Sequence, residues 1–147
     1  MRHPAALLIF ATFLIAAIPG GPAYAEPDNT IPTKISEQIV ADLARADLDA
    51  VATKTAKYLG SGASERLKNS FAAIRDLGKS QYTDLVYSRD YGKTEKDFIY
   101  KIDFDKAFAF VRFLWHVDNG DWHIVHLNYK TESDLPFPAG WEHIYPK

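Results

Sequence analysis

The spacing of the apolar residues changes at Gly78, and this change limits the folds open to the chain more than any other feature. Before Gly78, apolar residues recur every three or four positions, which places them on one face of a helix. After Gly78, apolar and polar residues alternate, as they do in strands that bury one face. The chain therefore divides into a helical half and a sheet half.

The helical half is predicted to contain three helices. The first begins near Thr33 and carries the apolar stripe Ile35, Ile39, Val40, Leu43 and Ala46. A bend near Asp47 separates it from a second helix, which ends at Gly60. The third helix carries the stripe Leu67, Phe71, Ile74 and Leu77, and Gly78 stands where helices commonly end.

The sheet half is predicted to contain four antiparallel strands. Aromatic and β-branched residues are frequent in the four segments, residues 82–91, 96–104, 107–117 and 122–130. Between the last two lies Asn119-Gly120, a strong hairpin signal because a type I′ turn needs positive φ at both central residues. Helices followed by a four-stranded antiparallel meander define an α+β domain.

The order of these elements resembles the NTF2-like (cystatin-like) superfamily. Many exported members open the final strand with a G-x-W-x-I pattern, which Gly120, Trp122 and Ile124 match. The resemblance covers residues 33–131 and implies N-terminal helices packed on a curved four-stranded antiparallel sheet. The superfamily includes binding proteins, isomerases and dehydratases, so the fold by itself does not define the function.

The first 25 residues have the features of a cleavable signal peptide. Arg2 and His3 form a short polar start, and residues 5–18 are almost entirely apolar. Ala23-Tyr24-Ala25 supplies the small residues that a signal peptidase reads. The apolar run is shorter than the roughly 20 residues of a membrane span. We therefore expect a periplasmic or secreted protein with no membrane anchor after cleavage.

The remainder of the chain is expected to form one domain. Residues 26–32 are predicted to be a flexible polar leader, and residues 33–131 the α+β domain. The C-terminal tail, residues 132–147, contains three prolines and should be irregular. Its apolar residues predict that it packs on the domain: Phe137, Trp141 and Ile144.

Composition excludes several classes of protein. The chain has no cysteine, which excludes disulfides and a lipid anchor attached to cysteine, so the core alone must stabilise the domain. The formal net charge is −2 and no basic cluster is present, so we expect no nucleic-acid partner. No glycine-rich phosphate loop or His-Glu-x-x-His motif occurs, and no cofactor is expected.

Counting outward from Asn119-Gly120 predicts which side chains share a face of the last hairpin. One set pairs Trp115 with Ile124, Phe113 with His126 and Val111 with Asn128. This set is richer in large apolar groups, and we expect it to face the helices. The opposite set is expected to form the outer face, with the pairs His116 and His123, Leu114 and Val125, Arg112 and Leu127, and Phe110 and Tyr129.

The predicted outer face carries more apolar surface than a monomer usually leaves in water. Either the tail around Phe137 and Trp141 or a second copy of the chain should cover it. Many NTF2-like proteins dimerise through this face, so the resemblance favours a homodimer.

Polar residues on the predicted inner face indicate a ligand pocket. We expect Tyr100, His126 and Asn128, together with Trp115, to line a cone between helices and sheet that accepts a small amphipathic molecule. Proton transfer by His126 with Asp84 or Tyr100 would instead make the protein a small lyase, isomerase or hydrolase. The alternative is that these residues are ordinary hydrogen-bonded core groups.

A second polar group lies at the tip of the last hairpin. The predicted pairing places His116 opposite His123, and Asp118 and Asp121 flank the turn on the same face. Two imidazoles and carboxylates would suit a divalent metal or a pH-sensitive contact. The simpler interpretation, which we favour, is a solvated hairpin with two turn-forming aspartates.

These observations favour an exported, non-catalytic binding or interaction module with a small-molecule or protein ligand. The pocket enzyme is the alternative.

Overall fold

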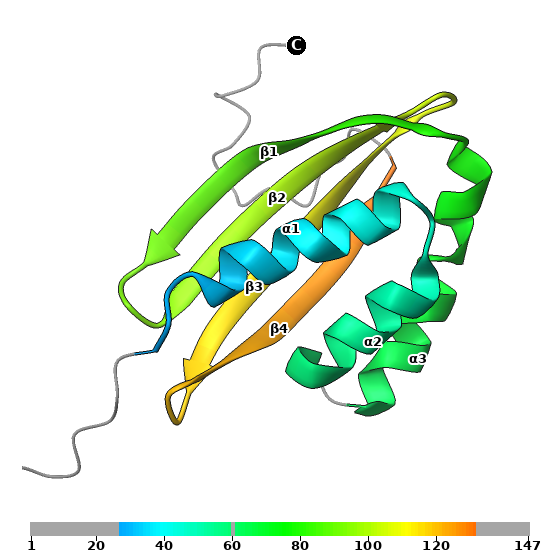
Figure 1. The fold of residues 1–147 in the computed structure, drawn as a ribbon. Coiled ribbons are helices and arrows are strands. Elements are labelled where there is room, and N and C mark those ends of the chain that lie inside the picture. The colour runs from blue at the N-terminus through cyan, green and yellow to red at the C-terminus, as the bar shows by residue number, and fades with distance from the viewer. Residues whose placement is uncertain (1–26, 60, 132–147) are drawn as a thin grey trace, which may run out of the picture.

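In a computed structural model, which describes residues 27–59 and 61–131, the chain is an α+β domain with a curved, open antiparallel sheet (Figure 1). The helical elements are α1 (Ile31–Ala44), α2 (Leu48–Leu59), α3 (Ser61–Ser70) and the 3₁₀ helix η1 (Ala72–Leu77). The strands are β1 (Ser80–Tyr91), β2 (Glu95–Phe104), β3 (Phe108–Asp118) and β4 (Asp121–Lys130), in the spatial order β1-β2-β3-β4. The predicted fold class is thus confirmed at the level of architecture.

The third predicted helix is divided into two elements. The α-helix α3 ends at Ser70, and η1 follows it up to Gly78. Phe71 and Ile74 are both buried, and their spacing of three residues matches the period of a 3₁₀ helix. Gly78 has φ of +94° and ends η1, a conformation that favours glycine.

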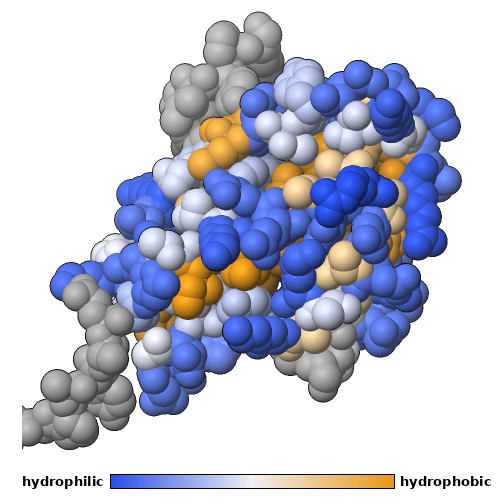
Figure 2. Space-filling view, viewed as in Figure 1, coloured by the Kyte–Doolittle hydropathy of each residue, from blue (hydrophilic) through white to orange (hydrophobic). Residues whose placement is uncertain are grey.

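Helices cover one face of the sheet (Figure 1). The helix α1 contacts β1, β2 and β3, and α2 contacts β4. We call the covered side the helix face. Its buried residues form the core with α1 and α2: Phe98, Tyr100, Ile102 and Phe104 of β2, Ala109, Val111, Phe113 and Trp115 of β3, and Trp122 and Ile124 of β4. From this side the surface is largely hydrophilic, with hydrophobic side chains visible between the elements (Figure 2).

The joint between α1 and α2 depends on Asp42 and Ala46. Ala46 has φ of +54°, which turns the chain out of α1, and the N–H of Asp47 donates to the carbonyl of Asp42 over 2.9 Å. The buried carboxylate of Asp42 accepts from Arg45 and from Lys54 of α2, so one carboxylate ties the two helices together.

A β-bulge in β4 changes the predicted faces of the last hairpin. The pairs Trp115–Ile124 and His116–His123 agree with the prediction, but Leu114 pairs with His126, which leaves Val125 as an extra residue. Because one inserted residue reverses every later side chain, Phe113 pairs with Leu127 instead of His126.

The residues beyond the bulge therefore exchange faces relative to the prediction. Leu127 and Tyr129, predicted on the outer face, pack against the core, and Tyr129 stacks on Phe71 with ring centroids 4.7 Å apart. His126 and Asn128, predicted on the inner face, lie on the other side of the sheet. The apolar side chains occupy the helix face because their burial there stabilises the fold, whereas burial of imidazole or amide groups without partners does not.

We call the side away from the helices the outer face. Its residues follow from the register: Tyr82, Asp84, Tyr87, Arg89 and Tyr91 of β1, Glu95, Asp97, Ile99, Lys101 and Asp103 of β2, Phe108, Phe110, Arg112, Leu114 and His116 of β3, and His123, His126, Asn128 and Lys130 of β4.

None of the helices in the described ranges has the length and apolar character that crossing a bilayer requires.

The remaining predicted segments lie mostly outside the description. The signal peptide at residues 1–25 and the tail at 132–147 are outside the described residues. The structure describes the predicted leader, residues 26–32, only from residue 27 onwards, and α1 begins inside it at Ile31 with Pro32 in its first turn, two residues before the predicted start.

Candidate functional site

The four residues predicted to line an inner pocket do not converge. Tyr100 and Trp115 lie on the helix face and are buried in the core. The indole of Trp115 packs edge-on against Tyr58 with ring centroids 5.2 Å apart, and its Nε1 donates to Ser36 Oγ over 2.9 Å. His126 and Asn128 lie on the outer face, so the sheet separates the two pairs.

The predicted proton-transfer residues are likewise apart. Asp84 lies exposed on β1, opposite Lys101, whereas His126 lies exposed on β4. Three strand spacings of about 4.8 Å separate β1 from β4, which is far beyond hydrogen-bond reach. Tyr100 is on the opposite face from both. The arrangement brings no two of these three groups together.

The hydroxyl of Tyr100 is buried and has no hydrogen-bond partner among the described residues. Burial raises the pKa of this phenol well above its ordinary value, and the negative charge of Glu37 adds to the shift. A phenol that remains protonated in the folded state does not act as a base near neutral pH. Tyr100 is therefore best described as a core residue.

Replacing Tyr100 with phenylalanine should leave the free energy of unfolding at pH 7 unchanged or raise it by up to about 1 kcal/mol. The reason is that the hydroxyl loses its hydrogen bonds to water when it is buried and gains no partner among the described residues in return. Above pH 10 the unfolded phenol loses its proton first, so wild-type stability should fall with rising pH and the variant should fall less. Urea denaturation at pH 7 and pH 10.5 measures both effects. Tyr82→Phe, at an exposed phenol, is the control at pH 7. A loss of more than about 1 kcal/mol at pH 7 would indicate that the hydroxyl is bonded.

The hairpin tip keeps the predicted pairing of its four polar residues. His116 pairs with His123 and Asp118 with Asp121. Nδ1 of His116 lies 3.3 Å from Oε1 of Glu95. Within the described ranges, no group of three His, Cys, Asp or Glu side chains is arranged to hold a metal ion.

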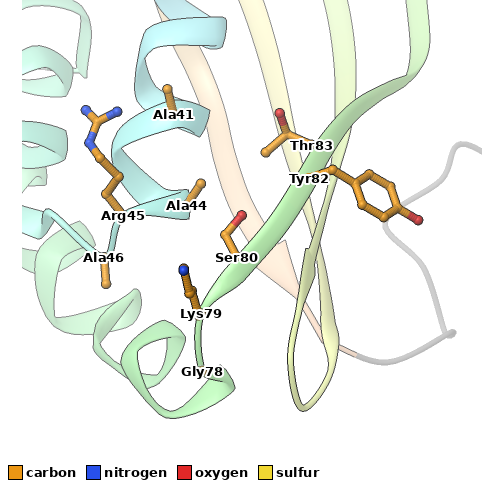
Figure 3. A pocket seen from close by; sticks show the side chains of 9 residues that line it. All are labelled: Ala41, Ala44, Arg45, Ala46, Gly78, Lys79, Ser80, Tyr82 and Thr83. Carbon is orange, nitrogen blue, oxygen red and sulfur yellow. The ribbon is translucent and has the colours of Figure 1, made fainter.

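A groove lies between the C-terminal end of α1 and the start of β1 (Figure 3). Its volume is about 590 Å³, within the range of small-molecule sites. The lining residues are Ala41, Ala44, Arg45, Ala46, Gly78, Lys79, Ser80, Tyr82 and Thr83. Most of them are small, so the backbones of α1 and β1 remain accessible between the two walls.

The polar groups of the groove are hydroxyls and cations. Ser80 and Thr83 point toward α1, whereas the ring of Tyr82 points away and Arg45 points back to the helices (Figure 3). Arg45 is bonded to Asp42, and Lys79 is exposed. The nine lining residues include two cations and no carboxylate, although the whole chain is acidic.

The centre of the outer face carries an ion pair between the half-buried Arg112 and the fully buried Asp97. Arg112 Nε lies 3.0 Å from Asp97 Oδ1, and a second guanidinium nitrogen lies 2.7 Å from Oδ2. The hydrogen bond to this carboxylate raises the pKa of Arg112 further. Beside the pair, the hydroxyls of Tyr87 and Tyr91 lie 3.3 Å apart, and burial raises the pKa of Tyr87.

The chain matches no model of a known protein family, and no curated protein matches it. The structure itself defines the class of protein as an α+β domain with helices on one face of a four-stranded antiparallel meander.

Sequence reasoning missed the groove and misplaced two candidate residues. The groove forms where two segments far apart in the chain meet. Alanines line much of it, and alanine in a sequence does not indicate a binding site. The bulge did leave a trace, because the large apolar residues of the last strand change phase between Ile124 and Leu127. That break in alternation predicts an inserted residue.

Proposed function

We propose that this chain is an exported, non-catalytic binding module that takes a small acidic molecule in the groove between α1 and β1. The observation that supports it is that the exposed Lys79 lines the groove and that none of the nine lining residues carries a carboxylate. A carboxylate or phosphate would accept bonds from Lys79 and from the hydroxyls of Ser80 and Thr83. The small apolar body of such a ligand would lie against the alanines of α1.

Export is the second part of the proposal. It rests on the charged start, the apolar run and the small residues before Glu26, which together are typical of signal peptides. A binding module in the periplasm or outside the cell would meet small organic acids in that compartment.

Benzoate should bind the groove and benzamide, its uncharged isostere, should not. In a titration followed by backbone amide resonances, benzoate is expected to shift Ala44, Ser80 and Thr83. Thr83→Leu should abolish these shifts, because a larger side chain on the helix side of β1 fills the groove. Lys79→Glu should weaken binding roughly threefold to tenfold, the effect of one or two exposed charge interactions.

The control is Ser88→Leu, which makes the same apolar change at another exposed position on the helix side of β1, outside the groove. This variant should bind benzoate as the wild type does. Equal shifts with benzamide, or unchanged binding in Thr83→Leu, would contradict the proposal.

A further inference from the structure

The centre of the outer face is as buried as the core, although the helices lie on the other side of the sheet. Ile99 and Asp97 are 0% exposed and Phe110 is 8% exposed. Long neighbouring side chains such as Arg112 and Tyr87 flank them in the register. Neighbours in one layer do not usually exclude water completely from a sheet face, so a covering segment is needed.

The chemistry of this face fits a polypeptide. Its residues are rich in Tyr, Phe, Arg and His, and protein interfaces favour the first three of these types. Oδ1 of Asn128 and Oδ2 of Asp103 are buried acceptors without a hydrogen-bond partner among the described residues. Buried acceptors are normally satisfied, and the N–H groups of an irregular chain segment would satisfy these two.

We propose that the C-terminal segment of the same chain, residues 132–147, covers the outer face. This segment begins two residues after Lys130, which ends β4 beside Phe110 at the border of the face. Sixteen residues reach at most about 50 Å, whereas a strand of the length of β3 extends about 36 Å. The segment can therefore cross the whole face.

The apolar residues of the segment match what the face lacks. Leu135, Phe137, Trp141 and Ile144 supply large apolar groups within a short stretch of chain. The face presents Ile99, Phe110 and Leu114 as apolar partners. A second copy of the chain could occupy the same face, but a tethered segment has an effective concentration on the order of millimolar, which favours the intramolecular contact.

The absence of cysteine from the chain allows a direct test by site-specific cross-linking. Ala139→Cys is combined with one cysteine on the outer face, in place of Asp84, Arg89 or His126, which are all exposed. Ala139→Cys with Ser88→Cys is the matched control, because Ser88 is exposed on the helix side of β1. Each full-length double variant is treated with a short bismaleimide and analysed by mass spectrometry and denaturing gel.

At least one outer-face pair should give a cross-linked monomer, at about tenfold higher yield than the control pair and independent of a tenfold dilution of the protein. Adding Trp141→Glu should lower this yield. Cross-linked dimers that disappear on dilution would overturn the proposal in favour of a second copy on this face. Yields that match the Ser88 control at all three positions would overturn it as well.

Discussion

Replacing Trp115 with alanine should lower the free energy of unfolding by about 3–5 kcal/mol. The indole is fully buried at the centre of the core, packs edge-on against Tyr58 and donates to Ser36. Its removal opens a large cavity between α1 and the sheet and leaves the hydroxyl of Ser36 without its partner. Urea denaturation followed by far-UV circular dichroism measures the change.

Two further variants separate the volume of Trp115 from its hydrogen bond. Ser36→Ala should cost about 1–2 kcal/mol, because it leaves the buried indole N–H unsatisfied. Val125→Ala, at an exposed position of the β4 bulge, should cost less than about 0.5 kcal/mol. If Trp115→Ala is as mild as Val125→Ala, the packing of α1 against β3 described above is wrong.

Replacing Arg112 with methionine should lower the free energy of unfolding by about 3 kcal/mol or more. The substitution keeps an unbranched side chain but removes both hydrogen bonds to Asp97, whose carboxylate is fully buried. An unpaired charge at such a position is far less favourable than the intact pair. Equilibrium denaturation at pH 7 provides the measurement.

The double variant Arg112→Met with Asp97→Leu tests whether the loss of stability comes from the unpaired charge of Asp97. Removing both charges should restore most of the lost stability, because an apolar pair avoids the desolvation of the ions. Arg89→Met should cost less than about 1 kcal/mol, since Arg89 is exposed, lies over the ring of Tyr91 and hydrogen-bonds Tyr87, but pairs with no buried charge among the interactions described for it. A double variant less stable than Arg112→Met alone would show that Asp97 has other essential partners.

Much of the fold could be predicted from periodicity and turn chemistry. The change of period at Gly78 separated the helices from the strands, and Asn119-Gly120 gave the correct pairing as far as Trp115 and Ile124. These features are local, because a type I′ turn sets the register of the residues next to it. The division of the third helix at Ser70 was not predicted, since its stripe fits both an α-helical and a 3₁₀ period.

The candidate sites were harder to predict because they depend on contacts between distant segments. One inserted residue, Val125, moved His126 and Asn128 out of the predicted pocket and brought Leu127 and Tyr129 into the core. The groove depends on how α1 crosses the start of β1, which no local pattern encodes. Its small side chains indicate a groove only when the positions of α1 and β1 relative to each other are known.

The bulges have a consequence for the behaviour of this protein at high concentration. Both strands at the borders of the sheet are irregular: β1 has an extra residue at Val86 and β4 at Val125. A regular border strand is a template on which other chains add in register, and this addition is a common start of aggregation and amyloid growth. Because each bulge interrupts the row of free backbone groups, the sheet cannot extend smoothly from one molecule to the next, and the protein should resist polymerisation through its sheet edges.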